Sequence, residues 1–151
     1  MSSLKICLAA SGGGHIRQLL DLLPAFSEHQ CFFMTESTAL GQSINSEFPT
    51  YFVDHVALGQ ARLGNPFKMI AAAVCNAVQS ARIIRHERPD IIVSTGAGSM
   101  AFGMLWGRLS GARLVLVDSF ARVRAPSAFA RLVGPLAHYR VAQSQGAAGG
   151  R

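Results

Sequence analysis

Three short loops of small and polar residues hold the side chains of this chain that are suited to chemistry. They are Ser11-Gly12-Gly13-Gly14-His15, Thr95-Gly96-Ala97-Gly98-Ser99 and Asp118-Ser119-Phe120. Consecutive glycines let backbone N–H groups approach an anion closely, and a helix that begins behind them adds partial positive charge. The first loop is therefore typical of a phosphate or diphosphate cradle. A tight turn that only allows a strand to pack against a helix uses the same residues and stays the alternative.

Two titratable side chains in these loops are candidates for proton transfer. Histidine is the side chain that exchanges protons near neutral pH, and His15 directly follows the glycines. A helix-start residue that hydrogen-bonds the loop is its alternative role. Asp118 is a second candidate base, whose alternatives are to cap the following segment or to pair with an arginine.

The first loop does not match the known nucleotide fingerprints. It lacks the G-x-G-x-x-G spacing and the lysine of G-x-x-x-x-G-K-[ST], and we identify no acidic ribose ligand after the second expected strand. We therefore expect no nucleotide cofactor on this chain. Cys7, Cys31 and Cys75 form no C-x-x-C pair and have no clustered histidines, so we expect buried thiols and no metal site.

The apolar runs between these loops alternate between strand and helix patterns. We expect strands near 4–9, 31–34, 51–53, 91–94, 114–117 and 139–142. Helices are expected at 16–23, 66–88, from about 99 past Trp106, and from Pro126, and a short helix or turn is expected at 37–46. This order predicts a Rossmann-like α/β fold, a parallel sheet flanked by helices, with the three loops converging at the carboxyl ends of the strands.

Composition fits one globular domain with a basic surface. The 151 residues are 50% apolar and 15% charged, and we assign 1–143 to a single domain and 144–151 to a flexible tail. The formal charge of +6 suits anionic lipid, a phosphorylated ligand or nucleic acid. Nucleic acid is disfavoured because the basic residues lack interleaved aromatic side chains and any groove-reading motif.

The long apolar stretches are interrupted by charged or polar residues before they reach the roughly 20 residues that span a bilayer. We expect neither a transmembrane helix nor a signal peptide, and so a cytoplasmic protein. In 66–88 and 99–108, apolar and basic residues alternate as in helices that lie on a membrane surface. Phe67, Met69, Ile70 and Val74 are equally consistent with a core helix.

Three ordered motifs carry a family resemblance that covers Lys5 to Gln143. They are Ser-Gly-Gly-Gly-His, Pro-Asp-Ile-Ile-Val-Ser-Thr-Gly-Ala-Gly and Val-Asp-Ser-Phe-Ala-Arg-Val. The chain resembles the membrane-recruiting subunit of the two-part N-acetylglucosaminyltransferase of dolichol-linked oligosaccharide synthesis. It is more similar to the bacterial PssD/CpsF-type counterparts of exopolysaccharide and capsule assembly.

The resemblance implies the N-terminal, acceptor-binding half of a GT-B glycosyltransferase, with the UDP-sugar site on a separate partner subunit. The implied reaction moves glucuronate or N-acetylglucosamine to a polyprenyl-diphosphate-linked saccharide, and the chain alone is expected to be inactive. The absence of the eukaryotic subunit's N-terminal membrane helix points to a peripheral protein on the cytoplasmic face of a bacterial inner membrane. A free-standing Rossmann enzyme that binds a nucleotide or nucleotide sugar is the alternative, and cofactor binding in isolation discriminates the two.

The resemblance also assigns site residues. Ser11, Gly12, Gly13, Gly14 and His15 face the diphosphate and sugar of the acceptor, and His15 orients or deprotonates the acceptor hydroxyl. Gly96, Ala97, Gly98 and Ser99 form a second wall. Asp118, Ser119 and Arg122 match a motif that begins with Glu in many relatives, so Asp118 is the shorter carboxylate there.

Overall fold

A computed structural model describes residues 3–56, 66–96, 98–117 and 128–141. Its centre is a parallel sheet in the order β3-β2-β1-β4-β5-β6. The strands are β1 (Lys5–Ala10), β2 (Gln30–Glu36), β3 (Thr50–Val53), β4 (Ile91–Gly96), β5 (Arg113–Val117) and β6 (Tyr139–Val141). The helices are α1 (Gly14–Leu22), α2 (Ala39–Asn45), α3 (Pro66–Glu87), α4 (Ala101–Leu109) and α5 (Ala128–Val133), with 3-10 turns η1 (Leu23–Phe26), η2 (Gly98–Met100) and η3 (Gly134–Leu136).

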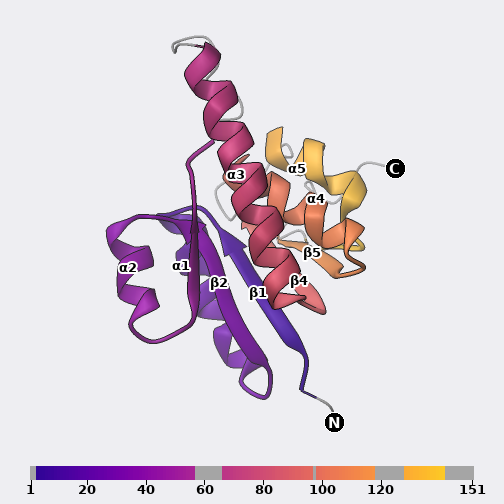
Figure 1. The fold of residues 1–151 in the computed structure, drawn as a ribbon. Helices are drawn as coiled ribbons and strands as arrows, with labels where there is room; N and C mark the ends of the chain where they lie inside the picture. The colour runs from indigo at the N-terminus through magenta and orange to yellow at the C-terminus, as the bar shows by residue number, and fades with distance from the viewer. Residues whose placement is uncertain (1–2, 57–65, 97, 118–127, 142–151) are drawn as a thin grey trace.

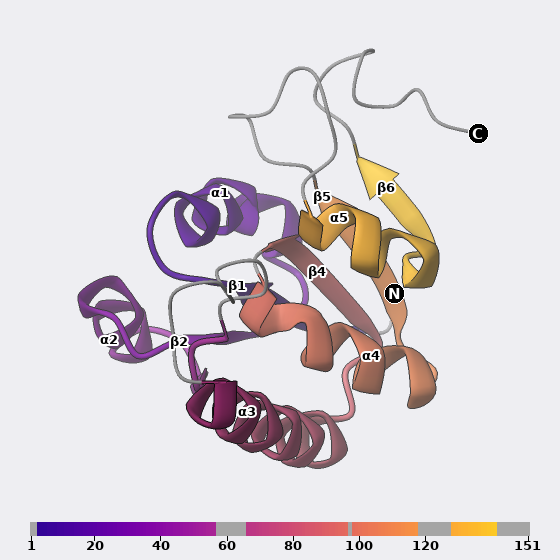
Figure 2. The same ribbon diagram turned by 90° about the horizontal axis from the view of Figure 1, so that it is seen from above.

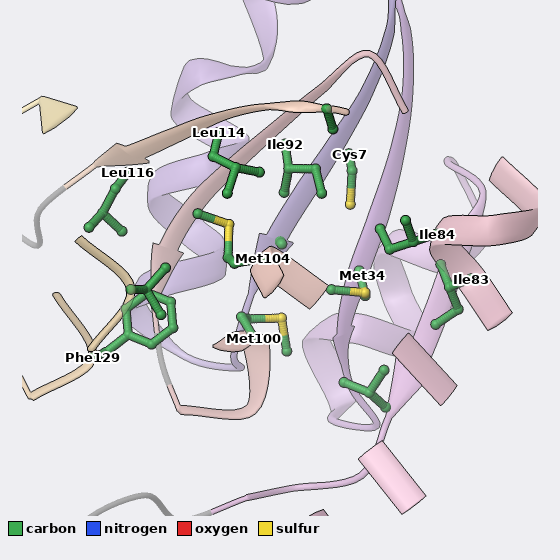
Figure 3. Close-up of a cluster of buried hydrophobic side chains, with 14 of the residues drawn as sticks. Cys7, Met34, Ile83, Ile84, Ile92, Met100, Met104, Leu114, Leu116 and Phe129 are labelled. Atoms are coloured by element: carbon green, nitrogen blue, oxygen red, sulfur yellow. The ribbon is translucent and has the colours of Figure 1, made fainter. Parts of the chain in front are cut away.

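Helices cover both faces of this sheet, as Figures 1 and 2 show. Alternate residues of a strand point to opposite faces, so each central strand feeds two apolar clusters. Cys7, Met34 and Ile92 pack on the side of α3, α4 and α5, where Met100 and Met104 fill the space under the helices (Figure 3). On the other face, a second cluster joins the sheet to α1 and α2, with Ile6, Leu8, Ile16, Phe33 and Ile44 at its centre. The predicted fold class is confirmed.

Helix α4 approaches the sheet closely because glycines face it. A Cβ built on Gly103 would lie 2.1 Å from Met34 Cε, and one on Gly107 would lie 2.1 Å from Ile92 Cδ1. Met34 and Ile92 are fully buried, so neither side chain has free space beside it. The two glycines therefore fix how near α4, and with it η2, lies to the strands.

The amino-terminal edge of the sheet is held by Glu87 at the end of α3. Its carboxylate pairs with Lys5 of β1, accepts a hydrogen bond from the Tyr51 hydroxyl of β3, and contacts His86 Nδ1 at 3.0 Å. Burial works against ionisation, but the hydrogen bonds from Lys5, Tyr51 and His86 together lower the pKa of Glu87. This cluster joins strands β1 and β3 to the helix that passes beneath them.

Two of the three cysteines are less buried than expected. Cys7 is buried in the core as expected, and burial, followed by the Glu87 charge, raises the pKa of its thiol well above the usual range. Cys31 is only half-buried, and Cys75 is exposed. The prediction of three buried thiols was wrong for Cys75, because that residue lies on the outward side of α3.

Candidate functional site

The two glycine loops predicted from the sequence lie together at the carboxyl end of the central strands. The Ser11 N–H donates a hydrogen bond to the Gly96 carbonyl at 3.0 Å, and the Thr95 hydroxyl donates to the His15 carbonyl at 2.8 Å. Ser11 is only 9% exposed, so its main role is in the contact between the two loops. These bonds join the start of α1 to the end of β4.

The first loop leaves the start of helix α1 open. Gly13, with φ +75°, is the residue before the helix, and no described side chain caps it. Gly13 and Gly14 are exposed, and a Cβ on either would meet nothing within 4 Å among the described residues. The first N–H groups of a helix need an external acceptor, and here an anion has access to them.

Gly12 serves the loop differently, because it faces the protein. A Cβ at Gly12 would lie 2.7 Å from Thr38 Cγ2, at the start of helix α2. Thr38 caps that helix, since its Oγ1 accepts a hydrogen bond from the Gly41 N–H at 3.2 Å. Gly12 thus allows close packing, as in the tight-turn alternative, while Gly13 and Gly14 leave amides open and the phosphate cradle stays a prediction.

His15, the second residue of α1, packs its ring against the end of β4. A Cβ on Gly96 would lie 3.4 Å from His15 Cε1, and Gly96 adopts φ +111°, so a side chain is disfavoured there by both space and backbone. His15 Nδ1 is buried and has no hydrogen-bond partner among the described residues. The His15 carbonyl, rather than its ring, makes the bond to the loop that the sequence analysis considered.

Ser99, predicted as part of the second wall, lies inside a polar network. It is 1% exposed, and its hydroxyl accepts a hydrogen bond from the Val56 N–H at 3.0 Å while donating one to the Glu36 carboxylate. Its carbonyl accepts from Asn76 Nδ2 at 3.0 Å, and the same amide donates to the Asp54 carbonyl at 2.6 Å. The Ser99 hydroxyl is thus engaged within the protein.

Glu36 is an acidic residue that was not singled out from the sequence. It ends β2, at the carboxyl end of the sheet where ligands bind in open parallel sheets, and no ribose ligand was expected there. Its side chain is 14% exposed and lies 2.9 Å, through Oε1, from His55 Nδ1. Oε1 of this carboxylate is therefore engaged by both Ser99 and His55. The signal in the sequence that could have identified Glu36 is a charged residue directly after a run of buried residues.

The other predicted site residues are placed less fully. Gly98 begins η2 and is half-buried. Ala97, Asp118, Ser119 and Arg122 lie outside the described residues. Their assignments stay predictions.

Helix α3 presents an apolar stripe on its outer side. Phe67, Ile70, Val74 and Val78 recur at helical spacing and are 81%, 62%, 57% and 44% exposed. Lys68, Arg82 and Arg85 are exposed on the same helix. In Figure 1 its first turns project beyond the other elements.

Among the described helices, α3 alone has the length and composition of a membrane-crossing segment, over Phe67–Glu87. No such helix was expected from the sequence, because charged and polar residues interrupt the apolar run. Only 22% of the apolar window is buried, but the inner side is packed. Asn76 bonds the backbone at Asp54, and Trp106 Nε1 donates to the Ala77 carbonyl at 3.0 Å.

Comparisons with known proteins identify the fold. No family model matches the chain, and no curated protein matches it. The crystal structure of MurG from Acinetobacter baumannii superposes with a TM-score of 0.74 at 16% identity, over 95% of this chain and 43% of that one. A glycosyltransferase from Rickettsia africae ESF-5 gives 0.56 at 15% identity, over 78% and 30%. The glycotransferase of kitacinnamycin gives 0.54 at 12% identity, over 90% and 35%.

The chain therefore spans less than half the length of each of these structures. Its Rossmann-like parallel sheet matches the N-terminal domain of GT-B glycosyltransferases, as the sequence analysis predicted. At identities of 12–16%, the likeness concerns the fold.

Proposed function

We propose that this chain is the acceptor-binding unit of a two-component glycosyltransferase, and that it works with a donor-binding partner subunit. The fold supports the acceptor-binding part of the proposal, since the parallel sheet matches the N-terminal domain of GT-B glycosyltransferases. The missing nucleotide fingerprint agrees with a UDP-sugar site on another polypeptide. The reaction we propose is transfer of glucuronate or N-acetylglucosamine to a polyprenyl-diphosphate-linked saccharide in exopolysaccharide or capsule biosynthesis.

The observation that carries the proposal is the junction of the two glycine loops. Uncapped amides at Gly13 and Gly14 suit the negative charge of a diphosphate. His15 is the next residue of the same helix turn, and its ring lies against Gly96 of the second loop. An acceptor held by its diphosphate there brings its sugar close to a titratable group. Binding of the acceptor diphosphate and removal of the acceptor's hydroxyl proton are then carried out by adjacent residues of one loop.

In an inverting transfer, the acceptor hydroxyl oxygen forms a bond to the anomeric carbon of the donor sugar while the bond to UDP breaks. The hydroxyl proton passes to a base, which we assign to His15, with Asp118 as the second candidate. The negative charge that develops on the departing UDP must be stabilised by the partner, where the nucleotide binds. This chain supplies acceptor binding and proton removal.

Helix α3 supports a role in membrane recruitment. Exposed apolar side chains beside basic ones favour the surface of an anionic bilayer, where apolar groups enter the interface and cations meet lipid phosphates. A polyprenyl-linked acceptor resides in that bilayer. We therefore propose that α3 attaches the protein peripherally to a membrane, which the family resemblance makes the cytoplasmic face of a bacterial inner membrane.

The test measures transfer from UDP-glucuronate and UDP-N-acetylglucosamine to undecaprenyl-diphosphate-linked glucose. The chain alone, a candidate donor-binding partner alone and the mixture are compared. We expect activity only in the mixture, and His15→Ala to lower kcat by about 10²–10⁴-fold while the complex still forms. His86→Ala, which removes an exposed histidine at the opposite edge of the sheet, is the matched control.

Two outcomes would contradict the proposal. Robust turnover by the chain alone would refute the need for a partner. Tight binding of a nucleotide cofactor by the chain, with no activity gained on mixing, would favour the free-standing Rossmann enzyme.

A further inference from the structure

A polar cluster at the same end of the sheet includes Ser99 of the second wall, and its two other members have been given no role in the proposed function. It consists of Glu36 at the end of β2, His55 shortly after β3, and Ser99 in η2 after β4. The Glu36 carboxylate contacts both other side chains through Oε1. Three separate strands thus bring one carboxylate, one imidazole and one hydroxyl together.

The hydrogen bonds in this cluster fix where the protons lie. The Val56 N–H donates to Ser99 Oγ at 3.0 Å, which leaves the Ser99 hydroxyl proton for Glu36. The carboxylate then accepts from His55, so Nδ1 carries the ring proton. In the neutral ring, Nε2 is left as a hydrogen-bond acceptor, on a side chain that is 69% exposed.

Stability alone does not account for the histidine. Ser99 already joins β2 to η2 and to the segment after β3 without it, and a pair as exposed as His55 with Glu36 contributes little to folding. What His55 adds is an accessible imidazole of fixed orientation. A carboxylate that orients one ring nitrogen and leaves the other for a ligand is a recurrent arrangement in binding and catalytic sites.

The cluster adjoins the glycine loops from the β2 side. Thr38, two residues after Glu36, contacts Gly12 of the first loop. Ser99 follows Gly96 by three residues, and Gly96 lies against the His15 ring. A ligand whose diphosphate occupies Gly13 and Gly14 therefore has the Glu36 cluster beside it along the edge of the sheet.

We propose that His55, oriented by Glu36 and Ser99, contacts the saccharide of the acceptor and accepts a hydrogen bond from a sugar hydroxyl through Nε2. This inference rests on the proposed function, and it adds a saccharide subsite on the β2–β3 side of the diphosphate cradle. His55 is a binding residue in this scheme, and Glu36 and Ser99 are positioning residues.

The kinetic test uses the assembled two-component enzyme with undecaprenyl-diphosphate-linked glucose as the varied substrate. We expect His55→Ala to raise the acceptor KM about tenfold, the equivalent of one lost hydrogen bond, and to leave the donor KM unchanged. His55→Gln, which offers an amide in place of Nε2, should recover part of the loss. His86→Ala is the matched control, because His86 Nδ1 contacts Glu87 at 3.0 Å and the ring is 75% exposed, but at the other edge of the sheet.

A spectroscopic readout separates contact from a structural effect. In the complex labelled at histidine, we expect the His55 ring resonances to shift on adding farnesyl-diphosphate-linked glucose and to stay in place on adding farnesyl diphosphate. Shifts with both probes, or with neither, would overturn the assignment to the saccharide even if His55→Ala unfolds the protein.

The two proposals fail in different ways. An unchanged acceptor KM in His55→Ala, in an enzyme that otherwise transfers sugar, overturns the His55 inference alone. No transfer by the unaltered complex refutes the proposed function, and the inference that rests on it falls with it.

Discussion

Gly12→Ala tests how the first glycine loop is built. The backbone of Gly12 has no positive φ, so an alanine is not strained by its conformation, and the effect comes from the contact at 2.7 Å with Thr38 Cγ2. Gly41, whose N–H is bonded by Thr38, ties that contact to the start of helix α2. The added methyl group should therefore increase the distance between the start of α1 and the start of α2.

The magnitude follows from two opposing effects. Overpacking by one methyl group costs about 1–3 kcal/mol. Replacing glycine by alanine restricts the unfolded chain and returns about 0.4–1 kcal/mol. We expect the free energy of unfolding to fall by roughly 1–2 kcal/mol, which in a domain of this size lowers Tm by about 2–4 °C for each kcal/mol.

Thr38→Ser is the compensating change. It removes Cγ2 and keeps Oγ1, the atom that accepts the hydrogen bond from Gly41. In the double variant, the nearest atoms to the new methyl are Oγ1 at 3.2 Å and Cβ at 3.4 Å of residue 38, close to ordinary contact. The double variant should be no less stable than Thr38→Ser alone.

Urea unfolding of the two single variants and the double variant measures the coupling, and the transfer assay with the partner follows activity. Because the new methyl group points toward residue 38 and not into open space, transfer should recover together with stability. A double variant as unstable as Gly12→Ala would refute the packing argument. Recovered stability without recovered transfer would show that Gly12 itself borders the acceptor.

Further predictions concern the core, the opposite edge and the outer helix. Gly107→Ala places a methyl group 2.1 Å from Ile92 Cδ1 and should lower the free energy of unfolding by about 1–3 kcal/mol. Ile92→Val removes Cδ1 and should reduce this loss in the double variant. Losses that simply add in the double variant, measured by urea unfolding, would contradict this. The hydrogen bond to Glu87 raises the pKa of Tyr51 to about 12, and burial and the negative charge of Glu87 contribute less to the same shift. The stabilisation from this hydrogen bond is complete below the unfolded pKa of about 10 and is lost as the pH rises toward 12. The difference in free energy of unfolding between the unaltered protein and Tyr51→Phe should therefore become smaller from about pH 10 to about pH 12. A difference that does not change with pH would contradict this. Ile70→Ser should weaken binding to anionic vesicles without changing Tm, since Ile70 is 62% exposed; undiminished binding would remove α3 from the membrane contact.

The strands and helices could be predicted because each is encoded locally. Strands buried on both faces appear as continuous apolar runs, such as Ile91-Ile92-Val93. That strand was expected to end at 94 but continues to Gly96, because Ala10 pairs with Gly96 across a register shift. Such an extension depends on the neighbouring strand and has no local signal.

The site was predicted in part for the same reason. The loop at Ser11–His15 is contiguous and could be recognised, whereas Ser99 bonds to Glu36 across 63 residues and to Val56 across 43. Pairings of that separation are set by the sheet order and cannot be deduced from spacing. Cys75 was misjudged because α3 is apolar on both sides, so its pattern does not say which side meets the sheet.

The sheet order has a consequence for the way the chain is made. Strands β1, β2 and β3 are close in sequence and can assemble first, but the other edge of β1 pairs with β4, where Lys5 and Asp90 meet across 85 residues. Ribosomes add roughly 5–20 residues per second, so that edge waits on the order of ten seconds for its partner. An unpaired edge on a central strand of mostly apolar residues is a template for aggregation during that time. Newly made chains should therefore be most vulnerable before β4 leaves the ribosome.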